Sequence, residues 1–329
     1  MKQTRKQEII RLLNRREYSP ADLQKKMGVS LVTVHHHLKE LCQDGYVEKW
    51  GRPPSVIYRL VPEESIDRIP SDVVENHFVF KDPVGNILVG SKGFLQWSRH
   101  ALKQKTLYEK VLDYEAYIQK LKEQNVHVFS HEKEQRLREE VGEPLHIKKI
   151  LFLFPYALPD FGKTKEYLLL ERAKEGDSRN KKYAEELIAL FFPALERFVQ
   201  EKNIDAVAFV PPSASREFQI MSRMKKLFSE MKGDMPIIPL KKKHGETVQQ
   251  QKNLKYPAER LENADKTFYI PTEGEKAYHR VLLVDDFVGS GATLNQIAKK
   301  MISQGVGEEV FGITIIGSME KKFPVVRKV

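Results

Sequence analysis

The sequence predicts an α/β protein that consists mainly of a doubly wound parallel sheet, preceded by a small and mostly helical domain. Short apolar runs at 147–154, 206–210 and 281–284 alternate with amphipathic helical segments, which is the pattern of parallel strands joined by crossover helices. The first sixty residues differ, because helical periodicity there gives way to two short strands. A chain of 329 residues is long enough to form both parts. We expect domains at 1–62 and 146–329, joined by a region at 63–145.

The N-terminal segment carries clear helix boundaries. Ser19 and Pro20 form an N-cap and first-turn pair, and Gly28 follows the last apolar position of that helix. Ser30 is placed to cap the next helix. The predicted elements are a basic first helix, a second helix ending at Gly28, a third helix at Leu31–Cys42, and strands at Tyr46–Trp50 and Val56–Leu60 around the loop Gly51–Ser55.

This order of elements resembles the winged helix-turn-helix of bacterial regulators. Residues 1–62 contain 12 Lys and Arg against 6 Asp and Glu, so they carry +6 of the chain's net charge of +10. The resemblance implies a third helix in the major groove of double-stranded DNA and a wing along its backbone. A winged helix that makes only protein contacts is the alternative. The residues expected to contact DNA are Ser30, Thr33, His35, His36, Lys39 and Arg52.

The run His35-His36-His37 invites a metal-binding interpretation. Neighbouring positions of a helix point about 100° apart, so these three side chains cannot all bind one ion. We therefore expect no protein metal site here, and we expect His37 to pack beside Leu38.

No motif in the region 63–145 indicates a chemical function. A hairpin is predicted near Asn76–Val89, followed by helical segments at Phe94–Lys105 and Thr106–Gln124. Charge-rich Ser130–Glu143 is either a surface helix or an exposed connector. The region could extend the larger domain or mediate dimerisation, and we expect a homodimer.

The most informative stretch is Val281–Leu294, which reads VLLVDDFVGSGATL. A buried strand ends in two adjacent carboxylates, and a glycine-rich loop then opens onto a helix N-terminus, where backbone N–H groups and the helix dipole attract an anion. It resembles the phosphoribosyl diphosphate (PRPP) signature of type I phosphoribosyltransferases. The resemblance implies that Asp285 and Asp286 hold the ribose diol and are the catalytic carboxylates of any transfer. It assigns the 5′-phosphate to Gly289, Ser290, Gly291, Ala292 and Thr293. A buried strand with an acidic turn and no PRPP, as in other α/β folds, is the alternative.

A second anion-binding segment is expected after the strand at 206–210. Ser213, Ser215 and Arg216 lie at its carboxyl end, and arginine suits phosphate geometry. Lys241 and Lys242 open a basic stretch that resembles the flexible loop of ComF-type competence-associated transferases, which implies contacts with pyrophosphate. Mg²⁺ is expected to be bound with PRPP, between the diphosphate group and the ribose hydroxyl groups. A proline turn without a ligand and a solvated lysine run are the alternatives.

Composition excludes several classes of protein. No apolar run is long enough to span a membrane, and the first residues lack the apolar core of a secretory signal. The single cysteine, Cys42, cannot form an internal disulfide. These features lead us to expect a cytoplasmic protein without a membrane partner.

Two functions fit the sequence. The first is a DNA-binding transcriptional regulator whose transferase-fold domain binds PRPP or a nucleotide, an architecture similar to that of the bacterial purine repressor. The second is an active phosphoribosyltransferase that transfers the 5-phosphoribosyl group to a nucleobase or related acceptor and carries an accessory winged helix. A nucleic-acid-processing factor akin to the ComF-type proteins rests on fold analogy alone.

Overall fold

The computed structural model describes residues 5–43, 45–52, 55–61, 69–82, 85–99, 105–124, 126–142, 144–175, 177–212, 217–242, 267–271 and 277–318. The described chain forms two compact units. The N-terminal unit holds the residues up to Glu123 together with Leu158–Lys165, and the C-terminal unit holds Gln124–Ala157 and the described residues from Glu166 onward. No helix in the described ranges combines the length and the apolar character needed to cross a membrane.

The N-terminal unit begins with the predicted helix-turn-helix and hairpin. Ser19 caps α2 and forms a capping box with Asp22, and Gly28 ends that helix with a φ of +62°. The strands β1 and β2 pair in antiparallel fashion. These elements confirm the predicted order and match its boundaries closely. They are α1 (Arg5–Leu13), α2 (Pro20–Met27), α3 (Leu31–Gln43), β1 (Val47–Trp50) and β2 (Ile57–Leu60).

The rest of this unit packs against the winged helix. Tyr108 meets Tyr46 edge to face at 4.7 Å between ring centroids, and its hydroxyl group donates a hydrogen bond to the Val61 carbonyl at 3.0 Å. One continuous apolar core therefore joins the winged helix to the segment that follows it. The elements of that segment are α4 (Asp72–His77), β3 (Val79–Lys81), β4 (Ile87–Val89), α5 (Gly90–Ser98), α6 (Leu107–Gln124), β7 (Ala157–Leu158) and β8 (Gly162–Lys163).

The C-terminal unit is built on a five-stranded sheet with the order β5-β6-β13-β12-β9. The last four strands run parallel, and only β5 is antiparallel to its neighbour β6. This sheet confirms the predicted doubly wound α/β fold. Its strands are β5 (His127–Val128), β6 (Ile147–Pro155), β9 (Ala206–Phe209), β12 (Tyr278–Val288) and β13 (Gly307–Gly317).

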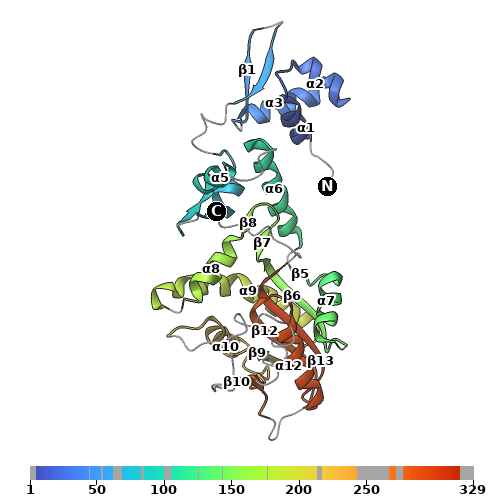
Figure 1. Ribbon diagram of the computed structural model, residues 1–329, viewed down its shortest axis with the longest axis vertical. Coiled ribbons are helices and arrows are strands. Elements are labelled where there is room, and N and C mark those ends of the chain that lie inside the picture. The colour runs from blue at the N-terminus through green and yellow to red at the C-terminus, as the bar shows by residue number, and fades with distance from the viewer. Residues whose placement is uncertain are drawn as a thin grey trace. The chain divides into compact units, whose positions relative to one another are not determined.

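Helices cover both faces of the sheet (Figure 1). One apolar core joins it to α8, α9 and α10, and another joins it to α7 and α12. A short antiparallel ladder, β10–β11, adds to the second core through Phe268. The bounds are α7 (His131–Val141), α8 (Lys165–Ala173), η2 (Ser178–Asn180), α9 (Lys181–Glu201), α10 (Ile220–Met231), α12 (Ala292–Ser303), β10 (Lys241–Lys242) and β11 (Phe268–Tyr269).

The two units divide the expected middle region 63–145. Its described residues up to Glu123 belong to the N-terminal unit, whereas those from Gln124 belong to the C-terminal unit and supply β5 and α7. The charge-rich segment predicted as a helix or a connector is a helix, since Ser130 caps α7 and Gly142 ends it with a φ of +68°. Part of the region thus supports the winged helix, and part completes the sheet.

Candidate functional site

The acid pair lies where the fold places ligands. Residues Val281–Val284 of β12 are fully buried, and Asp285 and Asp286 follow near the carboxyl end of that strand. Because β12 lies inside the parallel sheet, between β13 and β9, its carboxyl end opens at the edge where doubly wound folds bind ligands. The buried strand is confirmed. The ligand roles of the two carboxylates stay predictions.

The glycine-rich loop turns directly into α12. Gly291 is the N-cap residue with a φ of +89°, in the left-handed region that favours glycine. A Cβ at this position would lie 2.9 Å from Ile150 Cδ1 and 3.1 Å from Leu137 Cδ2. Since the cap has no side chain, it supplies no acceptor to the first-turn N–H groups, and Ser290 Oγ lies 3.4 Å from the Ala292 nitrogen. The loop therefore presents a helix N-terminus, the feature that suits a phosphate.

The two carboxyl groups differ in their electrostatics. Desolvation, together with the negative charge of Asp286, raises the pKa of the Asp285 carboxyl group to about 8. Lys174 and the hydrogen bond from the Asp286 N–H to Asp285 Oδ1, 2.8 Å long, act in the opposite direction. Asp285 therefore favours its protonated form more than an exposed carboxyl group does, and a cation or hydroxyl donors would favour its ionised form.

A lysine that the sequence analysis did not select already pairs with Asp286. The Lys174 ammonium group donates a hydrogen bond to Asp286 Oδ1 at 2.7 Å, and the Asp286 side chain is only 16% exposed. Lys174 directly follows α8 and is 112 positions away in sequence, so no local pattern indicated the contact. The ion pair shows that this carboxylate attracts a cation.

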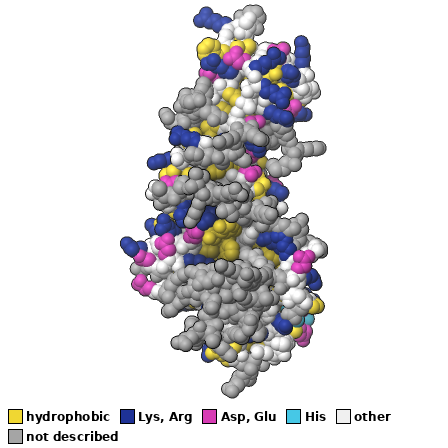
Figure 2. All heavy atoms as spheres, in the orientation of Figure 1, with side chains coloured by type: hydrophobic (Ala, Val, Ile, Leu, Met, Phe, Trp, Pro, Cys, Tyr) yellow, Lys and Arg dark blue, Asp and Glu magenta, His cyan; other side chains and the backbone are white. Residues whose placement is uncertain are grey.

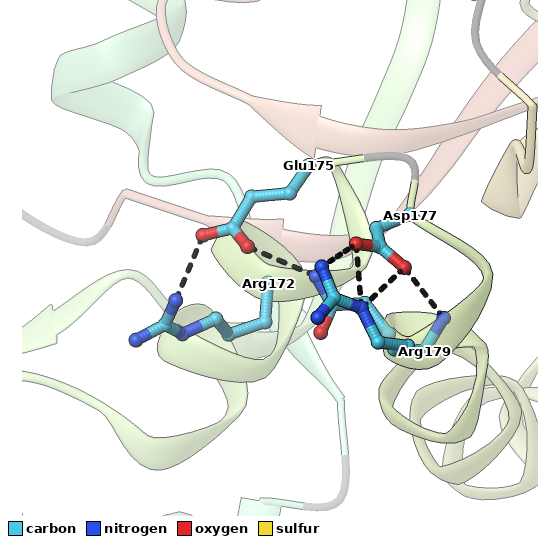
Figure 3. A network of polar contacts seen from close by, with 5 residues as sticks. Arg172, Glu175, Asp177 and Arg179 are labelled. Atoms are coloured by element: carbon cyan, nitrogen blue, oxygen red, sulfur yellow. Dashed lines mark hydrogen bonds and ion pairs between the residues drawn. The ribbon is translucent and has the colours of Figure 1, made fainter.

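The segment after Lys174 is fixed by exposed charged side chains (Figure 3). Arg172 donates to Glu175 Oε1 at 3.0 Å, and the Asn180 amide donates to Glu175 Oε2 at 2.9 Å. Arg179 binds Asp177 through Nε and Nη2, which lowers the pKa of that carboxyl group to about 2. Exposed pairs of this kind contribute little stability singly. The Glu175 carboxylate links Arg172, near the end of α8, to Asn180 of η2, and Lys174 lies between Arg172 and Glu175 in the sequence.

Aromatic rings lie beside the acid pair. Tyr156 meets Tyr167 edge to face with centroids 4.3 Å apart, and both rings lie about 6 Å from the ring of Phe287. The Lys174 ammonium is 5.9 Å from the centroid of Phe287. Burial raises the pKa of Tyr167, and Glu171 and Tyr156 add to the effect. The bulky residue after the acid pair therefore packs in an aromatic cluster.

The predicted pyrophosphate residues are only partly described. Ser213, Ser215 and Arg216 lie outside the described residues, as does most of the segment that resembles the flexible loop. Lys241 and Lys242 form β10, which pairs with β11 in antiparallel fashion. The neighbouring Phe268 carbonyl accepts a hydrogen bond from Lys300 of α12 at 2.7 Å, and burial lowers the pKa of Lys242. The two lysines therefore belong to a short ladder, and their role at pyrophosphate stays a prediction.

The third helix of the N-terminal unit exposes the predicted DNA-binding side chains. His35, His36 and Lys39 are exposed on α3, whereas Val34 and Leu38 are fully buried. Ser30 accepts a hydrogen bond from the Thr33 N–H at 3.1 Å, and their hydroxyl groups are 2.8 Å apart, so both residues help to begin the helix. In Figure 2, lysine and arginine side chains gather on the part that holds the winged helix.

Two exposed apolar or aromatic residues near this surface were not selected from the sequence. Val32 on α3 is 79% exposed. Trp50 at the end of β1 is 49% exposed, and the Arg59 guanidinium lies 3.7 Å from the centroid of its indole ring. Arg52, predicted at the wing tip, is exposed. Isolated exposed residues are common, which is why the sequence alone did not select them.

Among the described residues, His36, His37 and Glu40 form a group of potential metal ligands. His37 Nδ1 is 3.1 Å and His36 Nε2 is 3.7 Å from Glu40 Oε2, and the three potential ligand atoms lie within 4.8 Å of one another. Lys6 shares the same carboxylate oxygen at 3.6 Å. His37 is half-buried, as expected for a residue beside Leu38, and its partner is Glu40.

Comparison with known families assigns the two parts of the chain. A family model described as "Bacterial regulatory protein, arsR family" matches residues 3–49, and one described as "Phosphoribosyl transferase domain" matches residues 221–328. The chain thus combines an N-terminal helix-turn-helix domain with a phosphoribosyltransferase-type domain. The expected likenesses to ComF-type proteins and to the purine repressor stay predictions.

Among solved structures, the chain is similar to the crystal structure of a purine phosphoribosyltransferase from Pyrococcus horikoshii Ot3. The two are 19% identical, the match covers 44% of this chain and 92% of the other, and the TM-score is 0.23. No curated protein matches the chain.

Proposed function

We propose that this chain is a DNA-binding transcriptional regulator and that its phosphoribosyltransferase-type domain binds PRPP as the controlling ligand. The observation that carries the proposal is the acid pair Asp285-Asp286 at the carboxyl end of a central parallel strand, followed at once by the Gly291 turn and the N-terminus of α12. The two carboxylates attract hydroxyl groups and cations, and the N-terminus of α12 attracts phosphate. A phosphorylated ribose contains both groups, about one sugar ring apart.

The residues present suit PRPP together with Mg²⁺. Mg²⁺ prefers carboxylate and phosphate oxygens, and Asp286 already holds a cation at 2.7 Å in the form of Lys174. In this proposal Asp285 and Asp286 hold the ribose hydroxyl groups, while the N–H groups at Gly289–Thr293 bind the 5′-phosphate. When bound with PRPP, Mg²⁺ would offset the negative charge of the diphosphate group. Lys241, Lys242 and the serines and arginine of 213–216 would face the same group.

In this proposal the helix-turn-helix is the part of the regulator that binds DNA. Its recognition helix exposes His36 and Lys39, and residues 1–62 carry a net charge of +6. A basic surface of this kind binds the DNA backbone, and base contacts from the helix add selectivity. Proteins that read paired half-sites do so as dimers, so we propose a homodimer on double-stranded DNA.

Calorimetry tests the ligand site directly. PRPP with Mg²⁺ is titrated into the full chain and into Asp286→Asn, which removes the charge of one proposed diol ligand. We expect binding by the wild-type chain and at least a tenfold loss in the variant, since hydrogen bonds to a charged group contribute about 1.5–3 kcal/mol. Equal binding by the two proteins would contradict the assignment of Asp286 to the PRPP site.

A DNA-binding assay tests the regulatory role. Duplex from the region upstream of the protein's own gene should bind with a steep dependence on salt, and PRPP should change the affinity for this duplex more than for an unrelated one. Equal affinity for both duplexes, without a response to PRPP, would rule out the sensor.

The alternative is turnover of PRPP, which the loop Gly-Ser-Gly-Ala-Thr at 289–293 favours because it retains small residues and hydroxyl groups where the resemblance places the 5′-phosphate. A panel of nucleobases with PRPP and Mg²⁺ decides between the two. Release of pyrophosphate that depends on one base would establish an enzyme.

A further inference from the structure

Helix α7 carries two cations, Lys133 and Arg136, that have no acidic partner among the described residues. The Lys133 ammonium group donates a hydrogen bond to the Ser318 carbonyl oxygen. Arg136, one turn further along, has a buried Nη2 atom with no hydrogen-bond partner among the described residues. Within the described chain neither side chain forms an ion pair with a carboxylate. Burial lowers the pKa of Lys133 to about 8, and the positive charge of Arg136 adds to this effect.

Both residues are half-buried, and this arrangement is less favourable than one that an anion completes. Removing a cation from water costs several kcal/mol after relaxation, and a neighbouring like charge increases the cost. A carbonyl oxygen offsets only part of the loss. The two side chains are therefore better suited to a ligand that carries negative charge than to the partners they have in the described chain.

The neighbours of Lys133 place its ammonium group beside the glycine-rich loop. Ser318, whose carbonyl group it contacts, donates its own N–H to the Val288 carbonyl at 3.3 Å, and Val288 directly precedes that loop. The ammonium also lies 5.0 Å from the centroid of Phe129, and Phe129 Cε1 is 3.6 Å from the position that a Cβ on Gly291 would occupy. Two independent sets of contacts thus converge on the segment from Val288 to Gly291.

The strand order indicates which end of a phosphorylated sugar would be bound there. Ser318 follows β13, which lies on one side of β12. The predicted pyrophosphate residues at 213–216 follow β9, which lies on the other side of β12. Lys133 of α7 therefore contacts the side of β12 that faces β13, opposite to the side that faces β9.

We propose that Lys133 and Arg136 bind the phosphomonoester group held by the loop 289–293, so that two side-chain cations from α7 supplement the backbone N–H groups of α12. The inference rests on the proposed function, because it extends the PRPP site. It names binding residues that lie about 150 positions before the PRPP motif. The occupant is the 5′-phosphate, and the diphosphate end of the ligand is bound elsewhere.

Calorimetry on the full chain separates the two ends of the ligand. PRPP with Mg²⁺ is titrated directly, and ribose 5-phosphate and inorganic pyrophosphate are tested as competitors. Lys133→Met and Arg136→Met remove the two charges singly. Arg138→Met is the matched control, because Arg138 is an exposed cation on the same helix. Lys133→Arg tests whether a positive charge is sufficient, and far-UV circular dichroism checks that each variant is folded.

We expect Lys133→Met to weaken PRPP and ribose 5-phosphate by about tenfold or more, as the loss of a charged hydrogen bond implies. Pyrophosphate should compete equally well in this variant and in the wild type, Arg138→Met should bind normally, and Lys133→Arg should recover much of the affinity. Normal binding of ribose 5-phosphate by both Lys133→Met and Arg136→Met would overturn the inference.

The same experiment distinguishes this failure from a failure of the proposed function. If Lys133→Met and Arg136→Met bind PRPP as tightly as the wild type does, the PRPP site remains supported and only the two α7 residues are excluded from it. If the wild type binds a nucleoside 5′-monophosphate in place of PRPP, and Lys133→Met loses it, the phosphate site stands and PRPP is the wrong ligand. If the wild type binds no phosphomonoester at all, both proposals fail.

Discussion

The raised pKa of Asp285 makes a quantitative prediction about stability. The carboxyl group titrates at about 8 in the folded protein, compared with its ordinary 3.8. Between these values the unfolded chain has lost the proton that the folded chain retains. Ionisation therefore favours unfolding, so the stability of the C-terminal unit should fall as the pH rises from about 4 to 8 and then level off.

The size of the effect follows from the shift. Each unit of pKa difference corresponds to about 1.4 kcal/mol, so the cost from this group reaches a ceiling of about 5–6 kcal/mol above pH 8. Between pH 5 and pH 8 the difference is about 3–4 kcal/mol. Part of the shift comes from the neighbouring negative charge of Asp286, and we expect a loss of about 2–4 kcal/mol between pH 5 and pH 8. Asp285→Asn should remove this loss.

Urea unfolding followed by far-UV circular dichroism at pH 5, 6, 7 and 8 measures the slope. Both tryptophans, Trp50 and Trp97, lie in the N-terminal unit, so their fluorescence monitors that unit separately and should not respond to the substitution. Asp234→Asn, at an exposed position of the C-terminal unit, is the matched control. If the wild type and Asp285→Asn lose stability in parallel from pH 5 to pH 8, the carboxyl group is ionised in the folded state and the reasoning is wrong.

Three further changes test other parts of the structure. Because a carboxylate holds hydroxyl groups and cations better than a carboxylic acid, PRPP affinity should rise with pH as Asp285 ionises. Lys174→Met should raise the pKa of Asp285 further, because the lysine charge lowers it, so this rise should move to higher pH in calorimetric titrations. Lys182→Met, at an exposed lysine, should leave the profile unchanged. Gly291→Ala places a Cβ 2.9 Å from Ile150 Cδ1 at a φ of +89°. The free energy of unfolding should therefore fall by about 1–3 kcal/mol, measured from the midpoint of urea unfolding. An unchanged midpoint would mean that the turn relaxes. Lys39→Ala should reduce the slope of log affinity against log salt by about 1 if this exposed lysine contacts a phosphate, and an unchanged slope would remove it from the interface.

Local sequence signals were enough to predict the framework of the fold. The caps at Ser19 and Gly28 and the apolar run Val281–Val284 determine backbone geometry through neighbouring residues, so their effects can be read from short patterns. The hairpin predicted near Asn76–Val89 is confirmed as β3 and β4, and its turn is closed by a hydrogen bond between Asp82 and Asn86. Elements of this kind depend little on the rest of the chain.

The contacts around the acid pair could not be predicted in the same way. Lys174 reaches Asp286 across 112 positions, and Lys133 reaches Ser318 across 185. Each lysine occurs in a charge-rich segment, where solvent exposure is the usual outcome. Their roles arise only because parallel strands bring distant segments to one edge of the sheet. The same limit applies to Tyr108, whose place beneath the winged helix depends on a contact with Tyr46.

The position of Lys174 bears on how a ligand could act as a signal. Helix α8 begins at Lys165, the last residue of the segment Leu158–Lys165 that belongs to the N-terminal unit, and Lys174 follows the end of that helix. A ligand that takes over Asp286 must displace the ammonium group or share the carboxylate with it, and either change alters the restraint on the segment from Lys174 to Arg179. Binding of PRPP would then change a contact at the end of the helix that leads from one unit into the other.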